Sequence, residues 1–345
     1  MMSSGSKIMR MLRALGQRSD CVLIVLVLVL SALLILHYGG TTPGVNVEPG
    51  QELYHEPEET EPAPPDDIPK AGPPVRFLMY NVQNYFVPGE KSRSRYVSRS
   101  KSVKSRNAVA EVIAAAAPEI VGLIEIGGEK ALADLRERLA EHGLNYPYSY
   151  VLERRGEDRA LAILSVHPIV QNDSVADMAL QGQKNRKMLR GILDVTVELK
   201  DGRRFCIIGA HLKSRVATDA GAAEHLRSRE ACTLAVYLNE KMKRNPALPV
   251  LVYGDWNDGP SDLSLGVLTR GISKKSALTR LQPLDTRGHG WTIYYEEGKE
   301  YFVFDQIFVN NELRRRRGRR SNCGIVDCPA TAIGSDHRPV WCELR

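Results

Sequence analysis

The six residues 334–339, Gly-Ser-Asp-His-Arg-Pro, place the carboxylate of Asp336 beside the imidazole of His337, just before an apolar run. Adjacent side chains of extended backbone point in opposite directions, so this pair can serve one cleft only where the chain turns at the mouth of a sheet. An isolated Ser-Asp-His sequence is most often a surface turn. Here a functional role is favoured instead, because several strand-like segments upstream end in side chains suited to metal or phosphate chemistry.

Four apolar, strand-like segments each end in a polar group suited to metal or phosphate chemistry. An acid that closes an apolar strand is costly to bury alone, and a hard cation such as Mg²⁺ would compensate it. Two polar residues that are two positions apart at a strand end point the same way and could hold a water and a phosphoryl oxygen together. The residues at the four ends are Asn81, Glu125, His211 and the pair Asp255 and Asn257.

Several of these positions also have an ordinary structural explanation. Asn81 could simply form a turn, and a single histidine after a strand, such as His211, is more often structural than catalytic. Asp305 lies inside the apolar run 302–309 and therefore needs a buried partner, for which His337 is the obvious candidate.

Basic residues near the strand-like segments are candidates for binding phosphate. Lys213 follows His211 by two residues, and on an extended chain it would share the same face. Arg159 and Arg190 each precede a strand, where an arginine can hold a phosphate but more commonly forms a structural ion pair. The run 91–106, with seven basic residues and no acid, is either a phosphate-contacting arm or a solvated loop.

Composition predicts one large α/β (α+β) domain with appendages. The chain has 345 residues, 43% of them hydrophobic, and 28 glycines. The six cysteines are scattered, which argues against a zinc ribbon or a small disulfide scaffold. Export would expose Cys323 and Cys328 to oxidising conditions, and we expect them to pair, although so small a ring is often strained and two free thiols are the alternative.

The N-terminus predicts a membrane anchor. Residues 1–20 contain four basic residues and precede an uncharged run at residues 21–38, which is just long enough to span a bilayer. Because the run ends in a poor cleavage site, we expect an uncleaved signal anchor, with a cleaved and secreted protein as the alternative. The positive charges before the run predict a cytoplasmic N-terminus and a single-pass membrane protein whose remaining domain is extracytoplasmic.

Residues 39–74 are rich in proline and acidic residues and should form an extended, disordered linker. The remaining domain, residues 75–345, carries 42 Lys and Arg against 32 Asp and Glu, a net charge of +10. It includes six arginines within residues 314–320, which we expect to form an exposed loop. This charge favours an anionic substrate or surface.

The order and spacing of the strand-end residues resemble the endonuclease/exonuclease/phosphatase superfamily, the Mg²⁺-dependent phosphoesterases related to pancreatic-type deoxyribonuclease. The resemblance covers residues 75–345, and its most specific motifs are Gly-Asp-Trp-Asn, Phe-Asp-Gln-Ile and Gly-Ser-Asp-His-Arg-Pro. It implies a four-layer sandwich of two mainly antiparallel β-sheets flanked by helices, with the active site at one edge of the sheets.

The resemblance also implies a division of roles. Glu125 would be the principal ligand of Mg²⁺, with Mn²⁺ or Ca²⁺ as alternatives, and Asn81 and Asp336 would support the metal. Asp255 would align or deprotonate the attacking water. The other implied catalytic residues are Asn257, holding the water or a phosphoryl oxygen, His337, contacting the phosphate or moving a proton, Asp305, fixing the tautomer of that imidazole, and His211, stabilising the phosphoryl oxygens or protonating the leaving group.

Departures from the family pattern narrow the substrate. Abasic-site endonucleases have an acid where this chain has Gln83 and a tyrosine where it has Arg159. These differences argue against a role in abasic-site repair. The His211-Leu212 pair is instead similar to secreted nucleases, sphingomyelinases and related phosphatases.

We therefore expect a nuclease or general phosphodiesterase whose partners are nucleic acid or another phosphate ester and, through residues 21–38, a membrane. A phosphomonoesterase or a sphingomyelinase-like phospholipid phosphodiesterase is the alternative, favoured by membrane tethering. Charge does not separate the two, because basic residues also suit anionic headgroups. A non-catalytic binding module is a third possibility. No protein partner is predicted.

Overall fold

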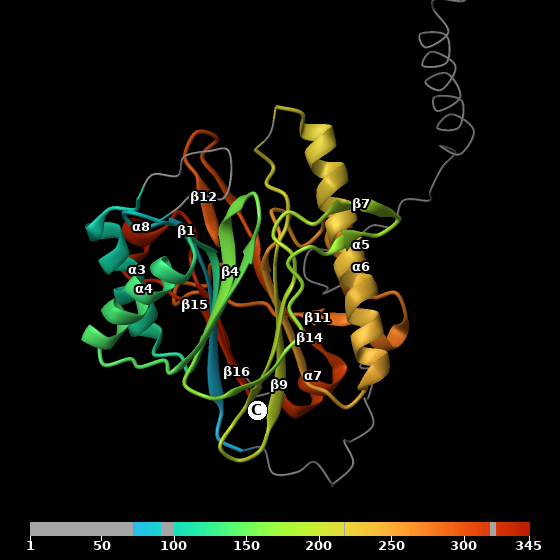
Figure 1. Cartoon of the computed structure of the whole chain (residues 1–345), viewed down its shortest axis with the longest axis horizontal. Helices are drawn as coiled ribbons and strands as arrows, with labels where there is room; N and C mark the ends of the chain where they lie inside the picture. Colours follow the sequence, from blue (N-terminus) through green and yellow to red (C-terminus); the bar gives the residue numbers. More distant parts are fainter. Residues whose placement is uncertain (1–71, 91–99, 217, 318–321) are drawn as a thin grey trace, which may run out of the picture. The chain divides into compact units, whose positions relative to one another are not determined.

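A computed structural model describes residues 72–90, 100–216, 218–317 and 322–345 (Figure 1). The predicted N-terminal segment 1–20, the apolar run 21–38 and almost all of the linker lie outside these ranges. In the part of the chain that is described, no helix is long and apolar enough to cross a lipid bilayer.

The first of two six-stranded sheets contains both the first and the last strand of the described chain. Its strand order is β15-β16-β1-β2-β4-β3, and every neighbouring pair is antiparallel except the central pair β1 and β2. Its strands are β1 (Val75–Tyr85), β2 (Ile120–Ile126), β3 (Tyr148–Arg154), β4 (Glu157–Ser165), β15 (Cys323–Ile325) and β16 (Val340–Leu344).

The second sheet repeats this plan with the order β11-β14-β10-β9-β8-β5, and only its central pair β9 and β10 is parallel. Its strands are β5 (Ile169–Asn172), β8 (Leu193–Glu198), β9 (Arg204–His211), β10 (Val250–Asp255), β11 (Leu278–Arg280) and β14 (Asp305–Asn310). Two short hairpins stand outside both sheets, β6 (Ala179–Leu180) with β7 (Gln183–Lys187) and β12 (Ile293–Tyr295) with β13 (Glu300–Phe302).

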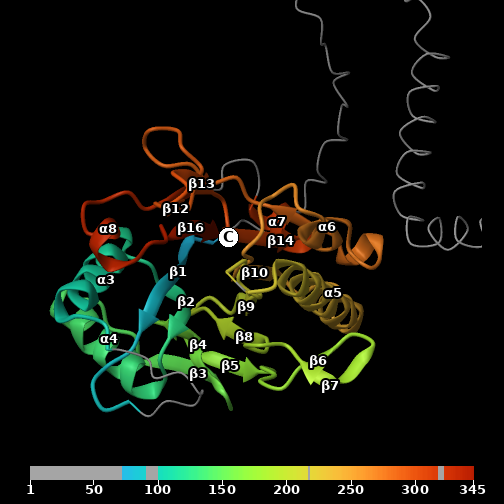
Figure 2. The same cartoon turned by 90° about the horizontal axis from the view of Figure 1, so that it is seen from above.

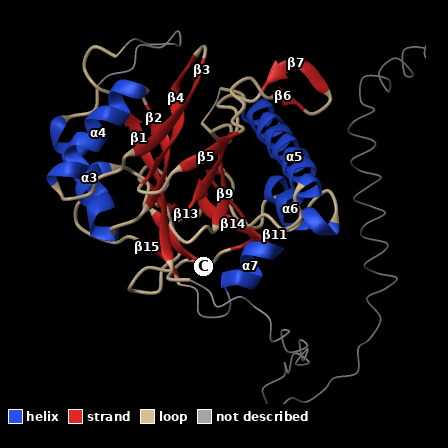
Figure 3. Cartoon of the chain, turned by 60° about the horizontal axis from the view of Figure 1, so that its bottom comes forward, coloured by secondary structure: helices blue, strands red, loops and turns tan. Residues whose placement is uncertain are grey.

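Helices cover the outer face of each sheet (Figures 2 and 3). Helices α3 (Val103–Ala116) and α4 (Glu129–Glu141) pack on the first sheet, and α5 (Ala220–Arg244) and α6 (Leu263–Arg270) pack on the second. The expected arrangement of two mainly antiparallel sheets between helices is thus confirmed. The remaining helices are short: η1 (Lys274–Ser276), α7 (Asn311–Arg317) and α8 (Thr331–Gly334).

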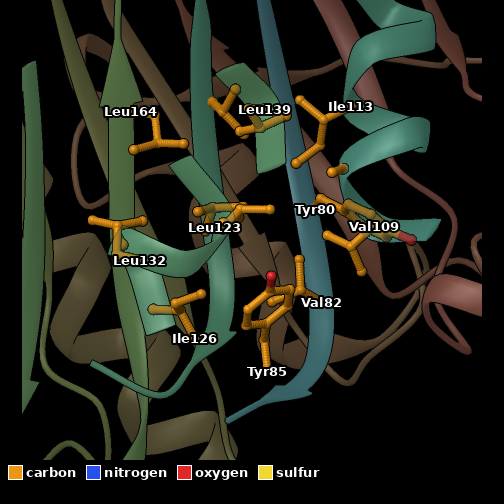
Figure 4. Close-up of a cluster of buried hydrophobic side chains, with 14 of the residues drawn as sticks. Tyr80, Val82, Tyr85, Val109, Ile113, Leu123, Ile126, Leu132, Leu139 and Leu164 are labelled. Atoms are coloured by element: carbon orange, nitrogen blue, oxygen red, sulfur yellow. The ribbon is translucent and has the colours of Figure 1, made fainter. Parts of the chain in front are cut away.

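Strand periodicity divides the apolar side chains among three cores. Leu78 and Tyr80 of β1 belong to the core under α3 and α4. Figure 4 shows Tyr80 pointing toward Val109 of α3. Phe77 and Met79 alternate with them and point into the core between the two sheets. A third core lies between the second sheet and α5. The strands are therefore buried on both faces, as their continuous apolar sequences indicate.

Tyr253 fills the space between the two sheets just below the ends of their central strands. A Cβ atom on Gly122 of β2 would lie 2.5 Å from Cζ of this ring, and one on Gly209 of β9 would lie 2.6 Å from it. The phenol donates a hydrogen bond to the carbonyl oxygen of Ala162 at 3.3 Å. Two glycines thus make room for one ring that sets the separation of the sheets at this point.

Two expectations about basic segments need correction or extension. Helix α3 begins with a cap at Ser102, whose side chain accepts the Ser105 N–H, so the basic run 91–106 ends inside a helix. Helix α7 includes the first residues of the arginine-rich segment, which was expected to be a loop, because Glu312 pairs with Arg315 and Arg316 one turn later. The rest of that segment, residues 318–320, lies outside the described ranges.

The predicted disulfide between Cys323 and Cys328 is wrong. Cys323 lies in β15, where it stands opposite Cys342 of β16. Cys328 follows the strand and lies near Thr331, with 3.5 Å between its Sγ and the hydroxyl oxygen. Because β15 continues to Ile325 before the chain turns, the two cysteines belong to different elements rather than to one loop.

Candidate active site

The central strands of both sheets bring their carboxyl ends to the same end of the inter-sheet core. In the second sheet, His211, Asp255 and Asp305 stand side by side on β9, β10 and β14. Each continues the alternation of residues that face the first sheet, since Tyr253 and Ile307 belong to the inter-sheet core. Three polar side chains therefore project from one row of the sheet into the same space.

Glu125 reaches this space because a bulge redirects it. Leu123 packs on the helix side of the first sheet and Ile124 on the inter-sheet side, but Ile126 is again on the helix side. The register between β2 and β4 shifts at this point, and Glu125 has a positive φ of 66°. A side chain other than glycine in this conformation costs about 1–2 kcal/mol, and such strain is concentrated at functional sites.

The end of β1 holds the Glu125 carboxylate in place. Gln83 and Asn84 both have positive φ values, 46° and 51°, and this turn directs the Asn84 N–H to Glu125 Oε2 at 3.0 Å. Arg159 Nε donates to Asn84 Oδ1 at 2.7 Å and lies 3.6 Å from Glu125 Oε2. Arg159 was predicted to bind phosphate, but its contacts here position Glu125. Asn84 carries no motif that predicts this role.

Asp255 is at the centre of the cluster and is almost fully buried. Its Oδ2 accepts a hydrogen bond from Asn81 Nδ2 at 2.9 Å and lies 3.5 Å from His211 Nε2 and 3.9 Å from His337 Nε2. Its Oδ1 accepts the Asn257 N–H at 3.0 Å. Burial raises the pKa of Asp255 to about 7, although the charge of His337 acts in the opposite direction. A carboxylate with this pKa can accept a proton near neutral pH.

His337 forms a buried pair with Asp305. Its Nδ1 donates to Asp305 Oδ2 at 2.7 Å, which leaves Nε2 directed at Asp255 and 3.4 Å from Asn81 Nδ2. Burial alone would lower the pKa of His337, but the carboxylates of Asp305, Asp255 and Asp336 together outweigh burial and raise the pKa well above its usual value. The imidazole is therefore held in its charged form at neutral pH.

The pKa of the second imidazole, His211, shifts in the opposite direction from that of His337. Burial, together with the positive charges of Arg190, His337 and Arg159, holds the pKa of His211 well below its usual value. His211 is therefore neutral near pH 7. Its Nδ1 is buried, and no described residue offers it a hydrogen bond.

The turn before His337 is tied to the end of β1 by Ser335. The hydroxyl of Ser335 donates to the carbonyl oxygen of Asn81 at 2.7 Å and accepts the His337 N–H at 3.1 Å. This places Asp336 on the open side of the cluster, where it is 43% exposed and its Oδ1 is 3.8 Å from His337 Nε2.

Asn257 is held in a positive-φ conformation (51°) by its neighbours. Its Nδ2 donates to the carbonyl oxygen of Leu212 at 3.1 Å, and its own carbonyl accepts from Arg215 Nε at 2.8 Å. Arg215 also pairs with Asp258 and lies 5.1 Å from the ring centre of Phe304. No motif in the sequence indicates Arg215, which follows the His-Leu-Lys-Ser segment.

The other predicted phosphate-binding residues take different positions. Lys213 Nζ donates to the carbonyl oxygens of Ser214 and Val216 in its own loop, because β9 ends at His211 and the alternation of an extended chain ends with it. Arg190 is buried, with Nε 3.4 Å from Glu157 Oε2. Its Nη1 is also buried and makes no hydrogen bond to any residue in the described ranges.

Lys101 is a further cation near the cluster. The sequence indicated the basic run 91–106 as a whole but not this residue within it. The backbone N–H of Lys101 donates to Phe86, and its Nζ donates to the carbonyl oxygen of Gln83 at 2.8 Å. Burial lowers the pKa of this ammonium, while the charges of Asp336 and Glu125 partly restore it. Lys101 is therefore anchored beside both carboxylates.

The donor set suits a hard divalent cation. Within the described ranges, no three acidic, histidine or cysteine side chains lie close enough to hold a metal ion by themselves. Mg²⁺, however, typically takes one or two carboxylates and completes its shell with amide oxygens, waters and substrate phosphate. The fixed Glu125 carboxylate, the Asn81 amide and the exposed Asp336 carboxylate match that requirement.

The fold and this cluster together define a hydrolase of phosphate ester bonds. The chain belongs to the endonuclease/exonuclease/phosphatase family, whose sequence model matches residues 81–323. The family expected from the motifs is thus confirmed. No curated protein sequence matches the chain.

Solved structures of the same fold cover 78–79% of this chain. The human Nocturnin catalytic domain with bound sulfate anion is 19% identical, with 94% of that chain covered and a TM-score of 0.52. An endonuclease/exonuclease/phosphatase from Bacteroides vulgatus is 17% identical, with 99% covered and a TM-score of 0.56. Beta toxin from Staphylococcus aureus is 15% identical, with 99% covered and a TM-score of 0.54.

Proposed function

We propose that the protein is a Mg²⁺-dependent phosphodiesterase, with nucleic acid as its first candidate substrate. The observation that carries this proposal is the arrangement of His211 and His337 on either side of Asp255, with pKa shifts in opposite directions. A buried carboxylate that accepts a proton near neutral pH stands next to an imidazolium that can give one.

In this proposal, Asp255 takes a proton from the water whose oxygen attacks phosphorus, and Asn257 orients that water or a phosphoryl oxygen. His337 supplies positive charge to the phosphoryl oxygens and a proton to the leaving oxygen, while neutral His211 donates an N–H to the same oxygens. Glu125, Asn81 and Asp336 would hold the metal. When bound, a divalent cation supplies further positive charge where the phosphate develops negative charge.

A nucleic acid substrate is supported by charge. The domain carries a net charge of +10, and Lys101, Arg159 and Arg190 contribute positive charge around the cluster. Basic surfaces attract polyanions and raise their rate of association. Mg²⁺ as the specific ion and an extracytoplasmic, membrane-anchored location remain part of the proposal and rest on residues 1–38 and the donor set.

A phospholipid phosphodiesterase is the second candidate, favoured by apolar side chains around Arg215. Val216 is 83% exposed and follows Arg215, and Leu263 is 87% exposed and follows Asp262, the ion-pair partner of Arg215. Phe302 of the β12–β13 hairpin lies 6.0 Å from the same guanidinium. Exposed apolar residues beside an active site are typical of proteins that act at a lipid surface.

A substrate panel tests both candidates. Plasmid DNA, RNA, bis-p-nitrophenyl phosphate, p-nitrophenyl phosphate and sphingomyelin vesicles would be compared with Mg²⁺ and with EDTA. Hydrolysis of the nucleic acids and of the diester, abolished by EDTA and by Asp255→Asn, supports the first proposal. Faster turnover of the monoester, or activity that persists in EDTA, contradicts it.

The second candidate has its own control. The double variant Val216→Ser, Leu263→Ser should slow hydrolysis of vesicles without changing hydrolysis of bis-p-nitrophenyl phosphate. Membrane fractionation and N-terminal sequencing of the full chain test the anchor separately. A soluble product that begins after residue 36 would show cleavage and secretion instead.

A further inference from the structure

Two cysteines from different strands face each other directly in the first sheet. Cys323 of β15 and Cys342 of β16 are Cα partners in the antiparallel register. Directly opposite residues of an antiparallel pair point to the same face of the sheet, so both side chains point toward the core between the two sheets. Cys342 is fully buried in the core between the two sheets, and Cys323 is partly buried against that same core.

The backbone hydrogen bonds identify the type of pair. The Glu343 N–H donates to the carbonyl oxygen of Asn322 at 3.0 Å, and the Val326 N–H donates to that of Pro339 at 2.9 Å. Asn322 and Glu343, and likewise Val326 and Pro339, are therefore directly opposite, hydrogen-bonded pairs. Because such pairs alternate with non-hydrogen-bonded ones, Cys323 and Cys342 form a non-hydrogen-bonded pair.

This type of pair brings its side chains closest together. Its Cα atoms are typically about 4.5 Å apart, which lies at the short end of the roughly 4.4–6.8 Å found for disulfides. We propose that Cys323 and Cys342 form a disulfide bond when the protein meets an oxidising environment. The bond would replace the pairing of Cys323 with Cys328 that the sequence suggested.

The bond would enclose the catalytic turn. Strands β15 and β16 flank the segment that contains Ser335, Asp336 and His337. A covalent link between the strands would fix the two ends of this segment and reduce the freedom of the unfolded chain. The proposal concerns a modification of the protein and does not depend on which phosphate ester it hydrolyses.

The chemistry balances with a small disulfide such as oxidised glutathione as the oxidant. The thiolate of Cys323, the more exposed of the two, attacks one glutathione sulfur and releases one glutathione thiolate. The Cys342 sulfur then loses its proton and attacks the Cys323 sulfur, and the second glutathione thiolate leaves. Two cysteine thiols are oxidised and one glutathione disulfide is reduced to two thiols.

Peptide mapping of the full chain tests the proposal. The reduced protein is incubated with oxidised glutathione, remaining thiols are alkylated, and the product is digested without reduction. Trypsin alone leaves Cys323, Cys328 and Cys342 in one peptide, because Arg338 precedes a proline. Additional cleavage before Asp327 and Asp336 separates them into peptides 321–326, 327–335 and 336–345.

The expected result is that peptide 321–326 is linked to peptide 336–345 while Cys328 is alkylated. Alkylation of all three cysteines, or a link to peptide 327–335, would overturn the proposal. Thermal unfolding gives a second measurement. A reducing agent should lower the melting temperature of the oxidised wild type by about 5 °C. It should do the same for the control Cys328→Ser but have no effect on Cys323→Ser.

Discussion

Asp305 Oδ2 and His337 Nδ1 lie 2.7 Å apart at the end of the inter-sheet core, and only 1% of Asp305 and 7% of His337 is exposed. The carboxylate comes from β14 of the second sheet, and the imidazole comes from the turn that leads into β16 of the first. The pair thus joins the two sheets through one charged hydrogen bond, and it fixes which ring nitrogen faces Asp255.

Replacement of Asp305 by Asn should reduce turnover by about a hundredfold or more, the range that proton-transfer groups typically contribute. Asparagine keeps the shape but removes the charge that raises the pKa of His337. The limb of the pH–rate profile that reports the imidazolium should therefore move to lower pH. Steady-state kinetics from pH 5 to 9 measure both effects. Unchanged turnover with an unmoved profile would make Asp305 a structural acid only.

Glu125→Gln should remove most metal-dependent hydrolysis, on the order of a hundredfold or more, while the fold persists. The amide oxygen can still accept the Asn84 N–H that holds this side chain, but the negative charge that attracts a cation is lost. Activity titrated with Mg²⁺ and circular dichroism measured on the same sample distinguish the two effects. Activity equal to the wild type would reject Glu125 as a metal ligand.

Ser335→Ala should lower both stability and turnover. The hydroxyl bridges the Asn81 carbonyl and the His337 N–H, and its loss leaves two buried backbone groups unpaired, at a cost of about 1–3 kcal/mol. The resulting shift of the catalytic turn should slow the reaction by roughly tenfold to a hundredfold. Urea unfolding and kcat measure the two losses. Ser335→Thr, which retains a hydroxyl, should recover more of both than alanine does.

Asp134, which accepts hydrogen bonds from Tyr85, Arg106 and Arg138, should make the stability of the protein depend on pH below pH 4. Partial burial would raise the pKa of Asp134, but hydrogen bonds from Arg138, Tyr85 and Arg106 lower it to about 2. A carboxylate with a depressed pKa in the folded state stabilises the protein fully above its unfolded pKa of about 4, and this contribution is lost as pH falls toward 2. The urea midpoints of the wild type and Asp134→Asn should therefore differ at pH 6 and converge near pH 2.

A matched control for this prediction is Asp177→Asn. Asp177 pairs with Arg154 at 3.2 Å, but its side chain is 70% exposed, and such a pair contributes little to stability. Its replacement should leave the urea midpoint nearly unchanged at both pH values. A difference between wild type and Asp134→Asn that does not depend on pH would contradict the assignment.

The sequence predicted the central strands well because their apolar runs are long, although β1 continues past Asn81, its expected end, to Tyr85. Asn81, His211 and Asp255 lie where strand alternation places them, and the family and the two-sheet architecture are confirmed. Glu125 was predicted to bind a metal because its carboxylate ends an apolar strand and would be costly to bury alone. Its direction, however, depends on a bulge with positive φ that ordinary alternation does not predict.

The errors have a common physical origin. Lys213 follows the last residue of β9, where alternation no longer applies. The partner of Cys323 depends on the register between β15 and β16, which closeness in sequence does not reveal. Asn84 and Arg215 act through backbone groups and neighbouring side chains, so neither carries a motif of its own.

The glycines around Tyr253 have a consequence for the evolution of this chain. Because the ring occupies the space where side chains of Gly122 and Gly209 would lie, a larger residue at either position is tolerated only if the ring is replaced as well. Single substitutions among these three positions should therefore be selected against, and compensating combinations retained. Loops and surface charges carry no such constraint, so they can change without altering the spacing of the sheets beneath the cluster.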